Sequence, residues 1–266
     1  MKEYMPELIF LIVVIIVSVT GFWEIFFGLN ADPNAFHYLH VVTSFIWLFL
    51  LLSQLIFIGR KNFAFHRKLG MSIFLMAPVL VATVALLSVH SAQRAALAGK
   101  EDTLLVQNVM VSFELGFFIL MGFILRRNLK LHASFLLGTA LLFMGIALFF
   151  SLISFVPQYK IEGPETFYRF ANAGATGGLI CAGVGVILFL IRKKNGWPWL
   201  LAPALLFLNE YINSLLTASG NLLPLTKFMG SFHPTTTFVV SFAVYFFLLS
   251  MEWQYNPGKR PRVRYR

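Results

Sequence analysis

The chain has 266 residues, of which 58% are hydrophobic and only 12% are charged. A soluble domain typically carries about 25% charged residues, so this composition excludes an ordinary soluble domain and favours a chain surrounded by lipid. The formal net charge of +10 does not indicate a nucleic-acid-binding protein, because the Lys and Arg residues lie in short segments between apolar runs. Cys181 is the only cysteine, which excludes an intrachain disulfide.

Eight apolar runs are each long enough to cross a hydrocarbon core of roughly 30 Å, which takes about 20 helical residues. They are 7–29, 33–58, 67–92, 104–125, 131–155, 168–191, 198–218 and 234–254. The first run is too long for a cleaved signal peptide and no small-residue cleavage site follows it. The sequence therefore predicts an all-α, polytopic transmembrane bundle over residues 1–255, followed by a basic tail over residues 256–266.

Several helix ends carry local signals. Asp32 and Pro33 form a typical start, with an N-cap followed by proline at the first helical position. Pro234 opens the last run in the same way. Pro78 and Pro203 lie inside apolar runs, where neighbouring helices can satisfy the carbonyls that proline leaves free.

The basic residues predict the orientation of the bundle. Sixteen Lys and Arg residues fall on the side that holds the N-terminus, and five fall on the opposite side, namely Arg94, Lys100, Lys160, Arg169 and Lys227. Because cytoplasmic loops carry the excess of positive charge, the N-terminal side is predicted to be cytoplasmic. An even number of spans then places both termini in the cytoplasm, and the tail could contact anionic lipid.

One short segment recurs along the chain. Residues 60–66 (RKNFAFH) resemble residues 126–132 (RRNLKLH), and each segment follows an even-numbered run and ends on a histidine. The spacing of 66 residues corresponds to two spans. This repeat suggests either a duplicated helical hairpin or a chance similarity of two basic loops.

Four histidines are predicted to lie near the side opposite the N-terminus: His37, His40, His90 and His233. The first two are spaced i, i+3 on one helix face. Imidazoles from different helices at one depth could bind Zn, Cu or Fe, with Glu24 and Asp32 as supporting oxygen donors. The alternative is a set of separate interfacial histidines, each hydrogen-bonded to backbone or water.

The other two histidines, His66 and His132, share a position in the repeat and should share a depth at the cytoplasmic side. Two imidazoles on facing helices are the ligands of a b-type haem. Gln54 near the end of its run is expected to point toward His66. The alternative is that each histidine caps a helix or contacts lipid phosphate.

Ionisable residues also occur deep inside two runs, as Glu114 and Glu210. Such residues are costly in a membrane and are candidates for a functional site. Asn209, Glu210 and Asn213 fall on one helical face and could line a polar cavity or relay protons. The alternative is that they are neutral hydrogen-bonding links between helices. Five glycines in the run 168–191 favour close helix packing: Gly174, Gly177, Gly178, Gly183 and Gly185.

The stretch from His40 through Gln54 and Arg60 to His66-Arg67-Lys68-Leu69-Gly70 resembles bacterial polytopic membrane proteins catalogued as the domain of unknown function of type 2306. His132 occupies the place of a later histidine of that pattern, without the basic residue and methionine that accompany it there. The resemblance spans residues 37–150 and implies a bacterial cytoplasmic-membrane protein with important histidines. A looser architectural similarity is to membrane haem b proteins.

The sequence contains no phosphate-binding loop, no nucleophile elbow and no zinc-protease motif. The leading hypothesis is a membrane protein that binds haem b or a transition metal through histidine and serves redox chemistry or its assembly. A second hypothesis is a small-solute or ion transporter with a polar site at the membrane midplane. A third is a structural subunit that contacts the lipid bilayer and other membrane subunits.

Overall fold

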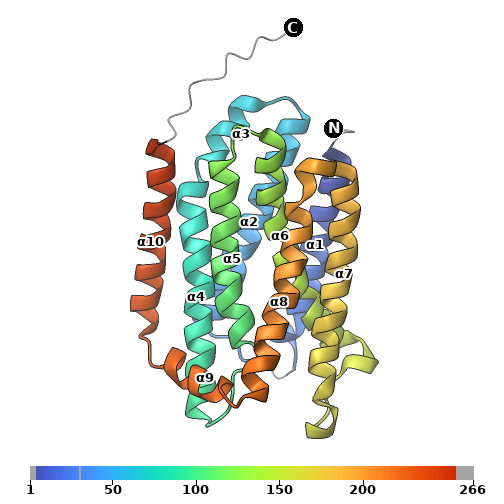
Figure 1. Cartoon of the computed structure of the whole chain (residues 1–266), viewed down its shortest axis with the longest axis vertical. Helices are drawn as coiled ribbons and strands as arrows, with labels where there is room; N and C mark the ends of the chain where they lie inside the picture. The colour runs from blue at the N-terminus through green and yellow to red at the C-terminus, as the bar shows by residue number, and fades with distance from the viewer. Residues whose placement is uncertain (1–3, 30, 256–266) are drawn as a thin grey trace.

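The computed structural model describes residues 4–29 and 31–255, so the predicted tail over 256–266 lies outside the described residues. Eight helices in this part of the chain are long and apolar enough to cross a membrane, which identifies an integral membrane protein. They are α1 (Met5–Phe27), α2 (Ala35–Gly59), α4 (Ile73–Leu97), α5 (Leu105–Ile124), α6 (Leu129–Phe155), α7 (Tyr168–Arg192), α8 (Pro198–Ala218) and α10 (Pro234–Tyr255) (Figure 1). The all-α fold class and the eight spans are confirmed.

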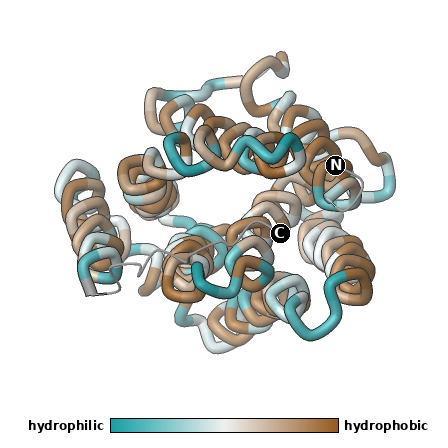
Figure 2. Tube along the Cα trace, turned by 90° about the horizontal axis from the view of Figure 1, so that it is seen from above, coloured by the Kyte–Doolittle hydropathy of each residue, from teal (hydrophilic) through white to brown (hydrophobic). Residues whose placement is uncertain are grey.

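The spans run alternately up and down, so that the start of α1 and the end of α10 lie at the same end of the bundle (Figure 1). We call this end the terminal end. Two short helices, α3 (Phe63–Gly70) and α9 (Leu222–Gly230), lie at the terminal end and at the opposite end, respectively. Short 3₁₀ turns complete the connections at Pro157–Tyr159, Pro164–Thr166 and Lys193–Gly196. Viewed along the bundle, the helices are mostly hydrophobic, whereas the segments that connect them are mostly hydrophilic (Figure 2).

Two predicted helix starts were wrong. The third span begins at Ile73 and not at residue 67, because residues 63–70 form the separate helix α3. The second span is capped by Asn34 and not by Asp32, since the Asn34 side chain accepts hydrogen bonds from the backbone N–H groups of residues 36 and 37. The start of the last span at Pro234 and the internal prolines Pro78 of α4 and Pro203 of α8 are as predicted.

The two repeated segments adopt the same local cap. Asn62 accepts a hydrogen bond from Phe65 N–H at 3.3 Å, and Asn128 accepts one from Leu131 N–H, also at 3.3 Å. The helices that follow differ, because α3 has 8 residues and α6 has 27. The repeat therefore recurs as a capping motif, and the duplicated hairpin stays a prediction.

The half of the bundle nearer the terminal end is tightly packed. Trp47, Phe118, Phe135 and Trp199 are all fully buried there. The rings of Phe118 and Phe135 meet edge to face with centroids 5.5 Å apart, a favourable aromatic geometry. The indole Nε1–H of Trp47 donates to Thr139 at 2.9 Å, so this large side chain is buried without an unsatisfied donor.

Glycines bring two helix pairs into close contact. A methyl group added at Gly21 of α1 would overlap the backbone carbonyl of Ala147 of α6. One added at Gly185 of α7 would overlap the backbone carbonyl of Trp199 of α8. Helices in lipid associate through such small residues, because lipid and side chains are equally apolar and contact must come from packing.

Two ion pairs at the terminal end tie helices together. The buried carboxylate of Glu7 pairs with Arg192 at the end of α7, and that guanidinium lies over the Tyr4 ring. Arg126 pairs with Glu252 of α10 at 3.9 Å and lies over the Trp253 ring. Arg126 and Arg192 are among the basic residues that predict the membrane orientation. In the structure they also join neighbouring helices at the terminal end through ion pairs.

Candidate functional site

A cavity of about 520 Å³ lies within the bundle. Its lining residues belong to the last turns of α1, to the middle and later turns of α4, α6 and α8, and to the first half of α2, α5 and α7. Because successive spans alternate in direction, these segments extend from the middle of the bundle toward the end opposite the terminal end. A volume of several hundred Å³ is typical of small-molecule sites.

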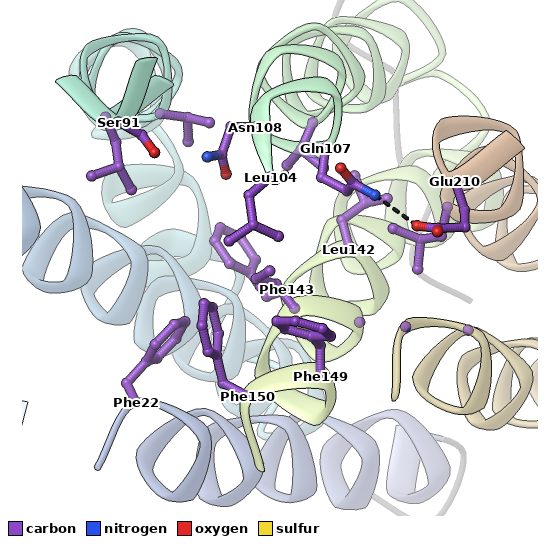
Figure 3. Close-up of a pocket in the computed structure, with 18 of the residues that line it drawn as sticks. Phe22, Ser91, Leu104, Gln107, Asn108, Leu142, Phe143, Phe149, Phe150 and Glu210 are labelled. Atoms are coloured by element: carbon purple, nitrogen blue, oxygen red, sulfur yellow. Dashed lines mark hydrogen bonds between the residues drawn. The ribbon is translucent and has the colours of Figure 1, made fainter. Parts of the chain in front are cut away.

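One wall of the cavity is aromatic. Phe22 of α1 and Phe143, Phe149 and Phe150 of α6 project toward the same space (Figure 3). Further rings come from other helices, namely Phe26, Phe170, Phe207 and Tyr211. Tyr211 of α8 lines the cavity and also exposes 63% of its surface. Such a wall suits an apolar ligand.

The facing wall carries a few polar side chains. Gln107 of α5 donates a hydrogen bond to Glu210 of α8 at 2.8 Å, and Ser91 and Asn108 lie along the same rim (Figure 3). The carbonyl oxygen of Gln107 is buried and has no hydrogen-bond partner. The ring nitrogen Nδ1 of His40, which also lines the cavity, is likewise buried and unpaired.

The loop before α5 connects this rim to α9. Asp102 is buried, and its backbone N–H donates to the Thr226 hydroxyl of α9 at 3.1 Å. Its carboxylate accepts from the backbone N–H of Leu104, a cavity residue, at 3.1 Å. Burial raises the pKa of Asp102, against the smaller opposing effect of hydrogen bonds from Ser91 and Leu104. The two hydrogen bonds of Asp102 therefore hold α9 against the loop that borders the cavity.

The predicted outer histidines are only partly brought together. The rings of His37 and His90 meet edge to face with centroids 5.8 Å apart. The Asn34 side chain links them, since its amide nitrogen donates to His90 Nε2 and its oxygen lies 2.8 Å from His37 Nδ1. His40 lies farther into the bundle at the cavity, and His233 is exposed at the start of α10.

Within residues 4–29 and 31–255, no three His, Cys, Asp or Glu side chains are grouped so that they could hold a metal ion. The predicted grouping of four outer imidazoles is therefore not formed, because only the rings of His37 and His90 are in contact, while His40 lies at the cavity and His233 is exposed before α10. The supporting oxygen donors are also peripheral. Glu24 and Asp32 are both exposed, and only Asp32 is near enough to His37 to interact with it electrostatically.

At the terminal end, Gln54 contacts His66 as expected from the sequence. Oriented to satisfy its hydrogen bonds, the Gln54 amide donates to the carbonyl oxygen and Nδ1 of His66 and accepts from the Gly70 N–H at 3.0 Å. His132 Nδ1 donates to the Gly122 carbonyl at 2.7 Å. Burial lowers the pKa of His66, and the nearby charges of His132 and Arg67 lower it further. The two histidines are thus close enough to interact.

The predicted intramembrane polar residues separate into two sites. Glu210 lies at the cavity, whereas Asn209 and Asn213 are buried away from the cavity lining. Asn209 donates to Glu114 of α5 at 2.8 Å. The sequence placed Asn209, Glu210 and Asn213 on one cavity wall, but their side chains diverge, because residues 209 and 210 point about 100° apart around a helix.

Sequence reasoning missed the aromatic wall and the Gln107–Glu210 hydrogen bond. The neighbouring phenylalanines Phe149 and Phe150 are indistinguishable in sequence from the many others that face lipid or core. Gln107 and Asn108 gave a weak signal, since they are adjacent amides just inside an apolar span. No family model, curated protein or solved structure matches the chain, so the resemblance over residues 37–150 stays a prediction.

Proposed function

We propose that this integral membrane protein binds an apolar small molecule that carries a hydrogen-bond donor such as a hydroxyl group, as a membrane carrier of such molecules would. The observation that carries this proposal is the cavity itself, with an aromatic wall opposite a short polar rim. Aromatic and apolar surfaces supply affinity, while a few polar groups orient the ligand.

The unpaired polar atoms indicate which chemical group the ligand presents. The Gln107 amide oxygen is only an acceptor, and it is buried at the cavity without a partner. Leaving such an atom unpaired costs about 1–3 kcal/mol. A ligand hydroxyl would satisfy it, and a second donor could pair with His40 Nδ1. Long-chain alcohols, phenols and hydroquinones have this combination of apolar bulk and hydroxyl donor.

The orientation of the protein in the membrane determines on which side of the membrane the cavity lies. We propose that the terminal end is cytoplasmic in a bacterial inner membrane, because most Lys and Arg residues in the sequence belong to that side. The cavity then extends from the middle of the membrane toward its outer side, and its ligand would enter from the outer leaflet or the outer aqueous phase.

The proposal is tested with 1-naphthol and 1-methoxynaphthalene as probes, measured by equilibrium binding to the protein in lipid nanodiscs and to empty nanodiscs. The two compounds share an apolar ring system, but only the naphthol has a donor. We expect saturable binding of 1-naphthol and at least about fivefold weaker binding of the methyl ether, because the ether leaves Gln107 unpaired.

A matched pair of variants locates the effect. Gln107→Met should reduce the preference for naphthol to near unity, whereas Gln93→Met should leave it unchanged. Gln93 lies on α4, outside the cavity lining, where it donates to the Phe232 carbonyl at 2.9 Å. Equal affinities for the two probes in the unaltered protein, or no saturable binding of either, would refute the proposed ligand class.

A second proposal, binding of haem b or a transition metal, rests on the position of His66 and His132 at the terminal end, where the charge of one acts on the other. His132 fits a ligand role, since a metal-binding histidine commonly donates its other ring N–H to a carbonyl, as His132 does to Gly122. His66 fits less well, because Gln54 donates to its Nδ1 and the ring proton then lies on Nε2. Oxidised and reduced absorption spectra with metal analysis test this, and haem or metal lost in His132→Ala would support it.

A further inference from the structure

Glu114 of α5 is buried between helices with only 4% of its surface exposed. One carboxyl oxygen, Oε1, accepts the hydrogen bond that Asn209 of α8 donates at 2.8 Å. The other oxygen, Oε2, is buried and has no hydrogen-bond partner. The residue lies in the tenth position of a 20-residue span and is therefore near the middle of the helix.

The surroundings of Glu114 contain more acceptors than donors. The side-chain oxygen of the fully buried Asn209 is also unpaired, and so is that of Asn213, which is 9% exposed. These two residues lie one turn apart on the same face of α8. Three buried oxygen atoms, Glu114 Oε2 and the amide oxygens of Asn209 and Asn213, thus have no hydrogen-bond donor, and burying a charged carboxylate without such a partner is costly.

No described basic side chain supplies a compensating positive charge. The two ion pairs in the described part of the chain, Glu7–Arg192 and Glu252–Arg126, do not include Glu114. The titratable side chains on the helices packed around α5 lie toward helix ends, line the cavity or have other partners. They are His90 and Arg94 of α4, Lys130 and His132 of α6, Glu210 and Tyr211 of α8, and Glu252 and Tyr245 of α10, of which Tyr245 donates to the Gly116 carbonyl at 2.7 Å.

We propose that Glu114 and Asn209 form a binding site for one proton, which is carried on Glu114 Oε2. A proton removes the buried negative charge and turns Glu114 Oε2 from an unpaired acceptor into a hydrogen-bond donor. A metal cation fits less well, because the three side-chain oxygens of Glu114 and Asn209 are fewer than the roughly six that hard cations take. The site is separate from the cavity, and this inference does not rest on the ligand proposed above.

Infrared spectroscopy of the protein in nanodiscs at pH 7 tests the proposal directly, since a protonated carboxyl group has a C=O stretch distinct from that of a carboxylate. We expect such a band in the unaltered protein, a small shift of it in D₂O, and its loss in Glu114→Gln. The matched control is Glu24→Gln, because Glu24 is exposed on α1 and should not contribute. Glu210→Gln assigns any second band. A spectrum in which Glu114→Gln removes no protonated-carboxyl band overturns the proposal.

A measurement on the unaltered protein covers the case in which Glu114→Gln does not fold. The midpoint of thermal unfolding at pH 8 is compared in sodium chloride and in choline chloride at equal ionic strength. A site occupied by a proton predicts the same midpoint in both salts. A midpoint that rises with sodium concentration would show that a metal cation fills the site and would contradict the proton assignment, because a ligand stabilises the state that binds it.

Discussion

Replacing Gly185 with leucine is expected to lower the midpoint of thermal unfolding by roughly 6–12 °C, which corresponds to about 3 kcal/mol of lost stability in a chain of this size. At this position of α7 even a methyl group would overlap the Trp199 carbonyl, which belongs to backbone and cannot move aside cheaply. Leucine would therefore force α7 and α8 apart. Thermal unfolding of detergent-solubilised protein measures the effect.

The chain offers a close control two residues away. Gly183 lies on the same helix, is exposed, and has nothing within 4 Å of an added Cβ. Gly183→Leu should change the midpoint by no more than about 2 °C, as substitutions outside packed interfaces usually do. Equal losses in the two variants would mean that α7 and α8 are not in contact through Gly185.

Replacing Gly174 with leucine is expected to weaken the binding of 1-naphthol at least about tenfold, a change of about 1.4 kcal/mol or more. Gly174 lines the cavity, and a Cβ there would lie 3.8 Å from the Glu210 carboxylate. The position accepts a side chain without backbone overlap, so the protein should remain folded. A leucine side chain would, however, occupy space beside the polar rim that the ligand needs.

Gly183→Leu again provides the comparison, since it adds the same side chain to the same helix outside the cavity lining. It should bind 1-naphthol as the unaltered protein does. If Gly174→Leu binds the probe with undiminished affinity while thermal unfolding shows both variants to be folded, the probe binds elsewhere and the cavity is not its site.

The spans were predictable because the apolar composition of a membrane helix is visible in its sequence. The starts of two spans were not, and the reason is local. A helix start depends on which side chain reaches the free N–H groups, and Asn34 does so where Asp32-Pro33 had the more familiar pattern. Likewise, the predicted third span began at residue 67 and so joined the end of α3 to α4, although Arg67, Lys68 and Gly70 distinguish this segment from the apolar helix that begins at Ile73.

The site was less predictable because it depends on which faces of seven helices converge. The polar residues Glu210 and His40 were identified in the sequence by their depth and spacing, and both line the cavity. The aromatic wall had no comparable signal, since the chain has 30 phenylalanines and lipid-facing positions carry them as well. The five glycines of the run 168–191 were all expected to pack closely, yet only some do: Gly185 touches backbone, Gly174 borders the cavity and Gly183 faces open space.

Native mass spectrometry of the protein purified in mild detergent tests the central claim most directly. If the cavity binds an apolar molecule, the unaltered protein should carry one small molecule of defined mass per chain. That added mass should be lost from Gly174→Leu and retained in Gly183→Leu. An unaltered protein without any bound molecule, or one whose bound molecule persists equally in Gly174→Leu, would contradict the assignment of this cavity as a ligand site.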